Sequence, residues 1–230
     1  MKILGIESAG ITASCAISED KTLLCEYTQN HKKTHSEKLM PLIVKAMEDR
    51  EIELKDIEVI AVSRGPGSYT GLRIGAAIAK GLAQAADIPI IAVPTMQALA
   101  ANVFDSNRYI VPILDAKAGR VYSGIYKWEN DNLITVKEQF PTDIYELADI
   151  IKSLDKECVL NGDGSVNYRE ILENSVNNIT FAPEKYNILN ASSVNYVGFQ
   201  LIKENKMISC YEFSPEYLRA SQAERMSDVK

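Results

Sequence analysis

A glycine-rich stretch from Ser63 to Gly75 constrains the fold of this chain more than any other feature. It follows an apolar, β-branched run at residues 59–62 and leads into a run of small residues that continues to Ala86. The glycines tolerate positive φ, the proline fixes one φ near a turn value, and Ser68 or Thr70 can cap the N–H groups of a following helix. The stretch therefore predicts a strand, a tight loop and a long helix in direct succession.

The loop itself has two interpretations. A glycine-rich turn at a helix N-terminus can cradle a phosphate, because free N–H groups and the helix dipole point at the anion. Gly65, Gly67 and Gly71, however, are spaced one residue too long for the dinucleotide fingerprint, and no Gly-Lys-Ser/Thr follows as a P-loop requires. The spacing favours a turn whose glycines permit close packing.

The helix after the loop is apolar around most of its circumference. Its polar positions fall on one narrow stripe, formed by Arg73, Lys80, Gln84 and Asp87. Small residues form two ridges at intervals of four, Gly71/Gly75/Ala79 and Ala77/Gly81/Ala85. A helix of this kind is buried on more than one side. We expect its own sheet on one side and another surface on the other, either inside a large core or on another helix.

Composition describes an ordinary globular protein. The chain has 230 residues, of which 46% are hydrophobic, and a formal net charge of −6. A negative net charge argues against a protein that binds nucleic acid by itself, because phosphate binding depends on clustered Lys and Arg. The four cysteines show no C-x-x-C pairing and the N-terminus has no signal-peptide pattern, which favours a cytoplasmic location. No segment is apolar enough over about 20 residues to span a membrane.

The order of the elements predicts an α/β protein of two lobes, residues 1–104 and 105–230. Each lobe opens with a meander of strands, expected at 2–6, 13–18 and 22–27 in the first and at 109–114, 121–128 and 133–138 in the second. Helices are expected at 36–50, 71–86, 95–104, 144–154 and 192–206, and buried strands at 59–62, 88–94 and 158–160. An acidic residue stands at the first turn of each lobe, Glu7 and Asp115. This duplication matches the two-lobed actin/hexokinase/heat-shock-ATPase (ASKHA) architecture.

The only two histidines, His31 and His35, have the i, i+4 spacing of a zinc pair on a helix. His31 falls in the loop that leads into the helix, and no third ligand is identifiable. The pair alone suggests a metallopeptidase-like hydrolase. A polar loop with a helix-capping residue is the simpler interpretation.

Four segments together resemble the signature of the TsaB family, bacterial accessory subunits in the synthesis of threonylcarbamoyladenosine at position 37 of tRNA. They are Gly65–Gly75, His35–Pro41, Asp115–Tyr122 and Pro215–Arg219, and they span nearly the whole chain. The family is similar to the catalytic subunit TsaD, whose two histidine metal ligands would fall here at Thr95 and Leu99. Leu99 has no donor atom. The resemblance therefore implies no catalytic residue and no metal site in this chain.

The resemblance also implies that the chain carries the remnant of a nucleotide-binding site. A vestigial cleft would be lined by Glu7, Ser8, Asp115, Gly162, Asp163 and Gly164. No clear Gly-Gly adenosine loop is present near the end of the second lobe. No cofactor is therefore expected, and ATP, ADP or Mg²⁺ would enter at most through the complex. The alternative is a stand-alone ATP-dependent phosphotransferase or hydrolase that uses Glu7 and Asp115 with Mg²⁺.

Finally, the resemblance implies a partner surface on the two long helices of the first lobe, 36–50 and 71–86. The residues expected there are Leu39, Leu42, Ile43, Ala46, Gly71, Leu72, Gly75, Ala76, Ile78, Ala79 and Leu82. The implied partners are TsaD in a heterodimer, the ATPase TsaE, and a second copy of the chain, with tRNA bound only through the complex.

Overall fold

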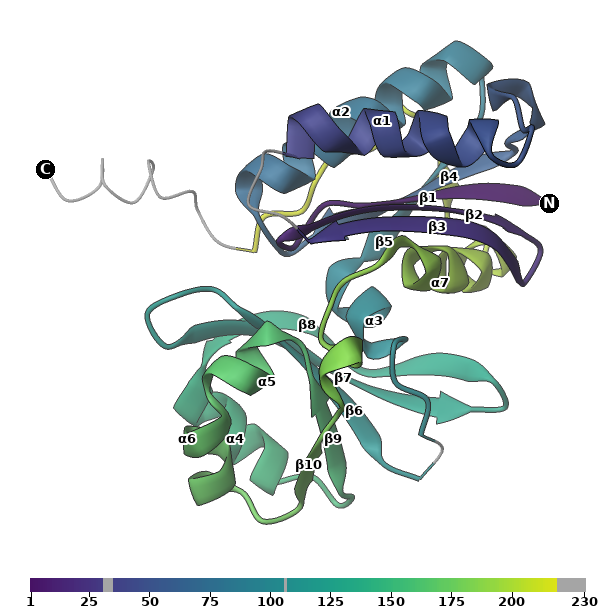
Figure 1. The fold of residues 1–230 in the computed structure, drawn as a ribbon. Coiled ribbons are helices and arrows are strands. Elements are labelled where there is room, and N and C mark those ends of the chain that lie inside the picture. Colours follow the sequence, from purple (N-terminus) through teal and green to yellow (C-terminus); the bar gives the residue numbers. More distant parts are fainter. Residues whose placement is uncertain (31–34, 106, 219–230) are drawn as a thin grey trace, which may run out of the picture.

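The computed structural model describes residues 1–30, 35–105 and 107–218, which form two lobes built on separate mixed sheets (Figure 1). In spatial order, the first sheet contains β11 (Met207–Ile208), β5 (Ile90–Pro94), β4 (Val59–Gly65), β1 (Lys2–Glu7), β2 (Thr12–Glu19) and β3 (Thr22–Asn30). The second contains β10 (Ile179–Phe181), β9 (Cys158–Asn161), β6 (Tyr109–Asp115), β7 (Arg120–Glu129) and β8 (Asn132–Asp143). The repeated meander that the sequence predicts is present in both.

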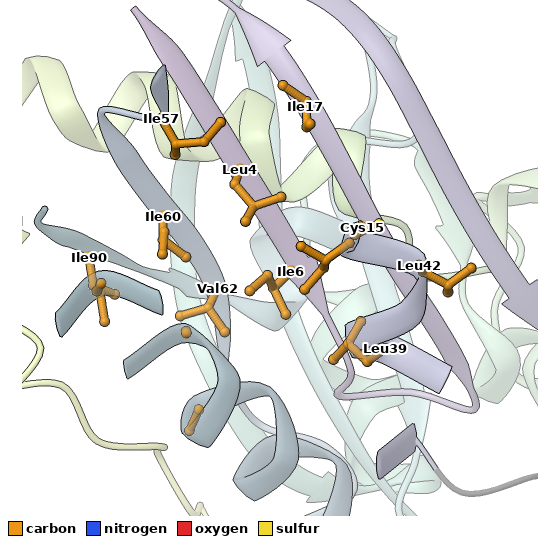
Figure 2. Close-up of a cluster of buried hydrophobic side chains, with 14 of the residues drawn as sticks. Leu4, Ile6, Cys15, Ile17, Leu39, Leu42, Ile57, Ile60, Val62 and Ile90 are labelled. Atoms are coloured by element: carbon orange, nitrogen blue, oxygen red, sulfur yellow. The ribbon is translucent and has the colours of Figure 1, made fainter. Parts of the chain in front are cut away.

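Helices cover both faces of the first sheet. On one face lie α1 (His35–Glu48) and α2 (Tyr69–Ala86), and on the other lies α7 (Ala191–Lys203) (Figure 1). Alternate residues of β1 divide between the faces, because side chains of a strand point to opposite sides of its sheet. Leu4 and Ile6 pack under α1 and α2, as Figure 2 shows, whereas Ile3 packs on α7. Burial on both faces explains why the central strands are continuously apolar.

The second lobe is covered mainly on one face. Here α4 (Ile144–Lys152), α5 (Asp163–Asn167) and α6 (Arg169–Ser175) lie beside the second sheet (Figure 1). A short helix, α3 (Thr95–Ala100), lies between the lobes. The core around α3 joins Ala9 and Leu72 of the first lobe to Tyr126 and Trp128 of the second. The lobes therefore share one apolar junction.

The structure corrects the course of the second half. The sequence assigns residues 105–230 to the second lobe, but α7 and β11 return to the first sheet, where β11 pairs antiparallel with β5. Gly198 permits this return, because a β-carbon there would lie 3.1 Å from the Ala61 side chain. The helix expected at 95–104 ends at Ala100. No helix in the described ranges is long and apolar enough to cross a membrane.

Candidate functional site

The glycine-rich loop is a strand-to-helix turn, as predicted. Strand β4 ends at Gly65, whose φ of 117° favours glycine, and α2 begins four residues later. Of the two candidate caps, Ser68 is the one used: its Oγ accepts a hydrogen bond from the Gly71 N–H at 3.2 Å. The cap fixes the direction in which α2 leaves the sheet.

The turn after β1 fills the space beside these glycines. A β-carbon on Gly67 would collide with the carbonyl oxygen of Ala9, and β-carbons on Gly71 and Gly75 would collide with the backbone and hydroxyl oxygens of Ser8. The Ser8 hydroxyl also donates to the Gly71 carbonyl at 2.9 Å. The glycines thus admit protein backbone rather than a phosphate, which confirms the close-packing interpretation.

Glu7, the acidic residue expected in a nucleotide cleft, is fully buried inside the first lobe. Its carboxylate accepts hydrogen bonds from the Ser63 hydroxyl and, at 2.6 Å, from the Ala9 N–H. Burial raises the pKa of Glu7 to about 7, against the opposing effect of these hydrogen bonds. The Glu7 side chain is therefore bound to its own loop and to β4.

Asp115, the second predicted acidic residue, lies at the end of β6 with its carboxylate surrounded by donors of its own lobe. It accepts from the Lys117 N–H and Nζ, both at 2.8 Å, from the Tyr168 hydroxyl at 3.0 Å and from Asn167 Nδ2 at 3.1 Å. Burial alone would raise the pKa of Asp115, but the bonds from Lys117 and Tyr168 hold it below its ordinary value. The Asp115 carboxylate is therefore ionised, and each of its oxygens already accepts two hydrogen bonds.

The second-lobe part of the predicted cleft comes together around Asp115. Asp163 begins α5 and accepts the Asp115 N–H at 2.9 Å, and burial raises the pKa of the Asp163 carboxyl. Gly162, with φ of 95°, and Gly164 pack against the Ile113 backbone. Asp115, Gly162, Asp163 and Gly164 thus form one cluster. Glu7 and Ser8 make their hydrogen bonds within the first lobe instead.

The two positions that correspond to metal ligands in the resemblance are structural. Thr95 is buried and its hydroxyl accepts the Gly65 N–H at 3.2 Å, while Leu99 is a core residue of the junction between the lobes. Within the ranges that the structure describes, no group of three or more His, Cys, Asp or Glu is placed to hold a metal ion. His31 lies outside the described residues.

Most of the predicted partner surface faces inward, which is a correction. Nine of the eleven residues are buried by the chain itself: Leu39, Leu42, Ile43, Ala46, Gly71, Leu72, Gly75, Ala76 and Ala79. Ile78 and Leu82 are half-buried against the same core. The apolar stripe of each helix covers the sheet, and the sequence cannot tell this use from contact with another subunit. Figure 2 shows Leu39 and Leu42 directed toward the strands.

The outward face of the same two helices carries the second ridge of small residues. Ala77, Gly81 and Ala85 are exposed along α2, and a β-carbon on Gly81 would have nothing within 4 Å. On the neighbouring α1, Met40 and Val44 are 36% and 41% exposed. We call these five residues the outer helix face. The spacing of the ridge was visible in the sequence, but its exposure was not.

A C-terminal segment, which the sequence did not connect with this site, borders the outer helix face. We call residues 209–217 the strap. Phe213 is buried in the core under α2, and the Lys80 ammonium donates to its carbonyl at 3.0 Å. Farther along, the Glu216 N–H donates to the Arg64 carbonyl at 2.6 Å. The sequence signals for this docking are the apolar Phe213 and the neighbouring signature segment Pro215–Arg219.

The strap also connects the lobes. Gln139 Nε2, on β8, donates to the Glu216 carboxylate at 2.7 Å and to the Gly65 carbonyl at 2.9 Å, and Arg64 Nε lies 3.1 Å from the same carboxylate. The second lobe, the glycine-rich loop and the strap therefore meet in one polar contact beside the N-terminus of α2.

Comparison with known proteins supports one family. The family model described as "TsaD: tRNA N6-adenosine threonylcarbamoyltransferase" matches residues 22–226. The tRNA threonylcarbamoyladenosine biosynthesis protein TsaB of Bacillus subtilis is 32% identical over 226 residues, covering 97% of this chain and 96% of the relative. TsaB of Escherichia coli is 27% identical over 231 residues, with the same coverages of 97% and 96%.

Solved structures agree on the fold. YeaZ from Pseudomonas aeruginosa superposes with a TM-score of 0.80 at 18% identity, over 94% of this chain and 99% of that one. A ROK hexokinase from Thermus thermophilus superposes with a TM-score of 0.51 at 13% identity, over 89% of this chain and 100% of that one. The duplicated sheets are thus the ASKHA architecture that the sequence predicts. With relatives that match from end to end, this chain belongs to the TsaB family, within the wider TsaD family, and has a role in the biosynthesis of threonylcarbamoyladenosine in tRNA.

Proposed function

We propose that this chain is a non-catalytic subunit that forms a heterodimer with a TsaD-type transferase. In that complex it supports transfer of the threonylcarbamoyl group to N6 of adenosine 37. TsaE and tRNA are partners of the assembly rather than of this chain alone. An isolated copy can pair with a second copy through the same surface.

The observation that carries this proposal is the outer helix face. Small residues at intervals of four let a second helix approach closely, and the exposed Met40 and Val44 supply apolar area on the neighbouring α1. The buried side of α1 and α2 is already packed on the sheet, so a partner that contacts these helices meets the outer helix face.

The state of the carboxylates supports the non-catalytic role. A Mg²⁺-dependent phosphotransferase needs carboxylate oxygens that can reach the ion and its substrate. Glu7 is fully buried and bonded to Ser63, and the Asp115 carboxylate accepts four hydrogen bonds from its own lobe. The test is nucleotide hydrolysis by the isolated chain: activity that Asp115→Asn abolishes would favour the stand-alone enzyme.

Gly81 offers a matched pair of variants for the partner surface. Both Gly81→Ala and Gly81→Leu replace a helical glycine with a better helix former, which stabilises an exposed helix by roughly 1 kcal/mol. Only the leucine projects far enough to hold a second helix away. We expect Gly81→Ala to bind TsaD like the wild type and Gly81→Leu to bind roughly 5- to 150-fold more weakly in isothermal titration calorimetry, since overpacking costs roughly 1–3 kcal/mol. Equal binding by both variants would show that the surface is wrongly assigned.

Reconstitution tests the function itself. The chain is combined with TsaD, TsaE, the adenylate-forming enzyme and tRNA, and the modified nucleoside is measured by mass spectrometry. We expect modification to depend on this chain and to be impaired by Gly81→Leu. Full modification without the chain would contradict the proposal.

A further inference from the structure

Two tyrosines and an arginine form a stacked group at the start of the outer helix face. The Arg73 guanidinium lies over the Tyr69 ring, 4.1 Å from its centroid, and donates to the Tyr69 hydroxyl. Arg73 Nε donates to the Tyr217 hydroxyl at 3.3 Å, and the Tyr69 and Tyr217 rings lie 4.8 Å apart at an interplanar angle of 38°. Arg73 is exposed and Tyr217 is 40% exposed. The three side chains therefore form one rigid, accessible group.

Two anchors of the strap that precede Tyr217 in the chain hold it in this group. Buried Phe213 anchors the strap under α2, and the Glu216 N–H and carboxylate bind the Arg64 carbonyl and Gln139. Tyr217 follows directly. Its ring is positioned by contacts that exist without any partner, so its ordering does not have to be supplied on binding.

The stacked group continues the small-residue ridge toward the N-terminus of α2. Tyr69, Arg73, Ala77, Gly81 and Ala85 recur at intervals of four and so form one ridge, which winds around α2 by about 40° per step. On this ridge Arg73 lies one turn before the exposed Ala77. A partner helix that contacts Ala77 therefore also passes beside the stacked group.

We propose that Arg73, stacked on Tyr69 and hydrogen-bonded to Tyr217, is the anchor of the partner interface and receives a carboxylate from an acidic side chain of the partner subunit. The inference rests on the proposed heterodimer and specifies the chemistry of the partner. A planar guanidinium forms two parallel hydrogen bonds with a carboxylate, and Arg and Tyr are enriched among the residues that dominate binding energy. The C-terminal strap thereby becomes part of the interface.

The experiment measures the affinity of the full chain for purified TsaD by titration calorimetry at two salt concentrations. We expect Arg73→Ala to weaken binding by about 30-fold or more, as for other hot-spot residues, and Arg73→Glu to weaken it further by repulsion. Arg73→Lys keeps the charge but loses the planar stack, so its affinity falls between wild type and Arg73→Ala. Tyr217→Ala lowers affinity because Arg73 loses its support.

The second lobe offers a matched control. Arg169 lies over the Phe181 ring at 4.2 Å and is exposed, yet it is far from α2 in the chain and on the other lobe. Arg169→Ala removes the same kind of pair and is expected to leave TsaD binding unchanged. Added salt should weaken the wild type and Arg169→Ala alike, but affect Arg73→Ala less. Circular dichroism melting of every variant confirms that it is folded.

The outcomes separate the two proposals. If Gly81→Leu disrupts binding while folded Arg73→Ala and Arg73→Glu bind like the wild type, the anchor is refuted and the partner surface stands. If neither Gly81→Leu nor the Arg73 variants change binding, the partner surface itself is wrong. A loss in Arg73→Glu that equals the loss in Arg73→Ala would refute the acidic partner group.

Discussion

The Ser8 hydroxyl would collide with a β-carbon on Gly75, and the same hydroxyl donates to the Gly71 carbonyl at 2.9 Å. Ser8 directly follows the first strand of the chain, and Gly75 lies in the second turn of α2. One serine thus locks the sheet to the helix that carries the proposed partner surface. The small residues on the two sides of α2 therefore have different roles. Gly71 and Gly75 admit the turn after β1, whereas Gly81 lies on the exposed side.

The first prediction compares these two sides. Gly75→Ala is expected to destabilise the isolated chain by roughly 1–3 kcal/mol, because the added methyl group collides with Ser8 in a packed region. Gly81→Ala is expected to stabilise it by roughly 1 kcal/mol, because its surroundings are open. Urea unfolding followed by circular dichroism measures both. Equal stability of the two variants would contradict the close contact at Gly75.

The second prediction concerns Glu7 and pH. Because the folded-state pKa of about 7 lies above the ordinary value of 4.5, the folded chain keeps a proton that the unfolded chain has lost between these pH values. The contribution of Glu7 to stability is therefore complete below about pH 4.5 and is lost as the pH rises through 7. The loss is about 3 kcal/mol at 1.36 kcal/mol per pH unit.

Glu7→Gln removes this titration while it keeps the side-chain shape. The free energy of unfolding of the wild type relative to Glu7→Gln is expected to fall between pH 5 and pH 8, as measured by urea titrations at each pH. Parallel pH profiles for the two proteins would show that Glu7 does not titrate in this range.

The third prediction concerns Asp115. Its pKa lies below the ordinary 3.8, so its stabilising effect is present above that value and is lost as the pH falls further. Asp115→Ala leaves the Tyr168 hydroxyl and the Lys117 N–H without their acceptor, which is expected to cost roughly 1–3 kcal/mol at pH 7. Asp115→Asn keeps one acceptor oxygen and should lose less. Thermal melts at pH 7 rank the variants, and an unchanged Asp115→Ala would show that the cluster contributes nothing to stability.

The fourth prediction concerns the contact between the lobes at Gln139 and Glu216. Single substitutions to alanine and the double variant form a double-mutant cycle. Because the two side chains share a hydrogen bond at 2.7 Å, we expect a coupling energy of roughly 1 kcal/mol. Additive effects in urea unfolding would show that the strap and β8 are energetically independent.

The sequence alone predicted most of the architecture. Continuous apolar runs identified the buried strands, the glycine spacing excluded the usual phosphate loops, and the repeated meander indicated two lobes. These features are local, because strand and turn preferences act over a few residues. The packing role of the glycines was also correctly predicted, and the structure adds that Ser8 and Ala9 are the groups they accommodate.

The tertiary structure decided which side of each helix is free. An apolar helix face looks the same in sequence whether it covers a sheet or another subunit, so Leu39, Gly71 and Gly75 were assigned to a partner although the chain buries them itself. The return of α7 and the strap to the first lobe likewise depends on contacts between residues far apart in sequence, such as Glu216 with Arg64. Hydrophobic patterning fixes which residues are buried, but only the packed fold determines against what they are buried.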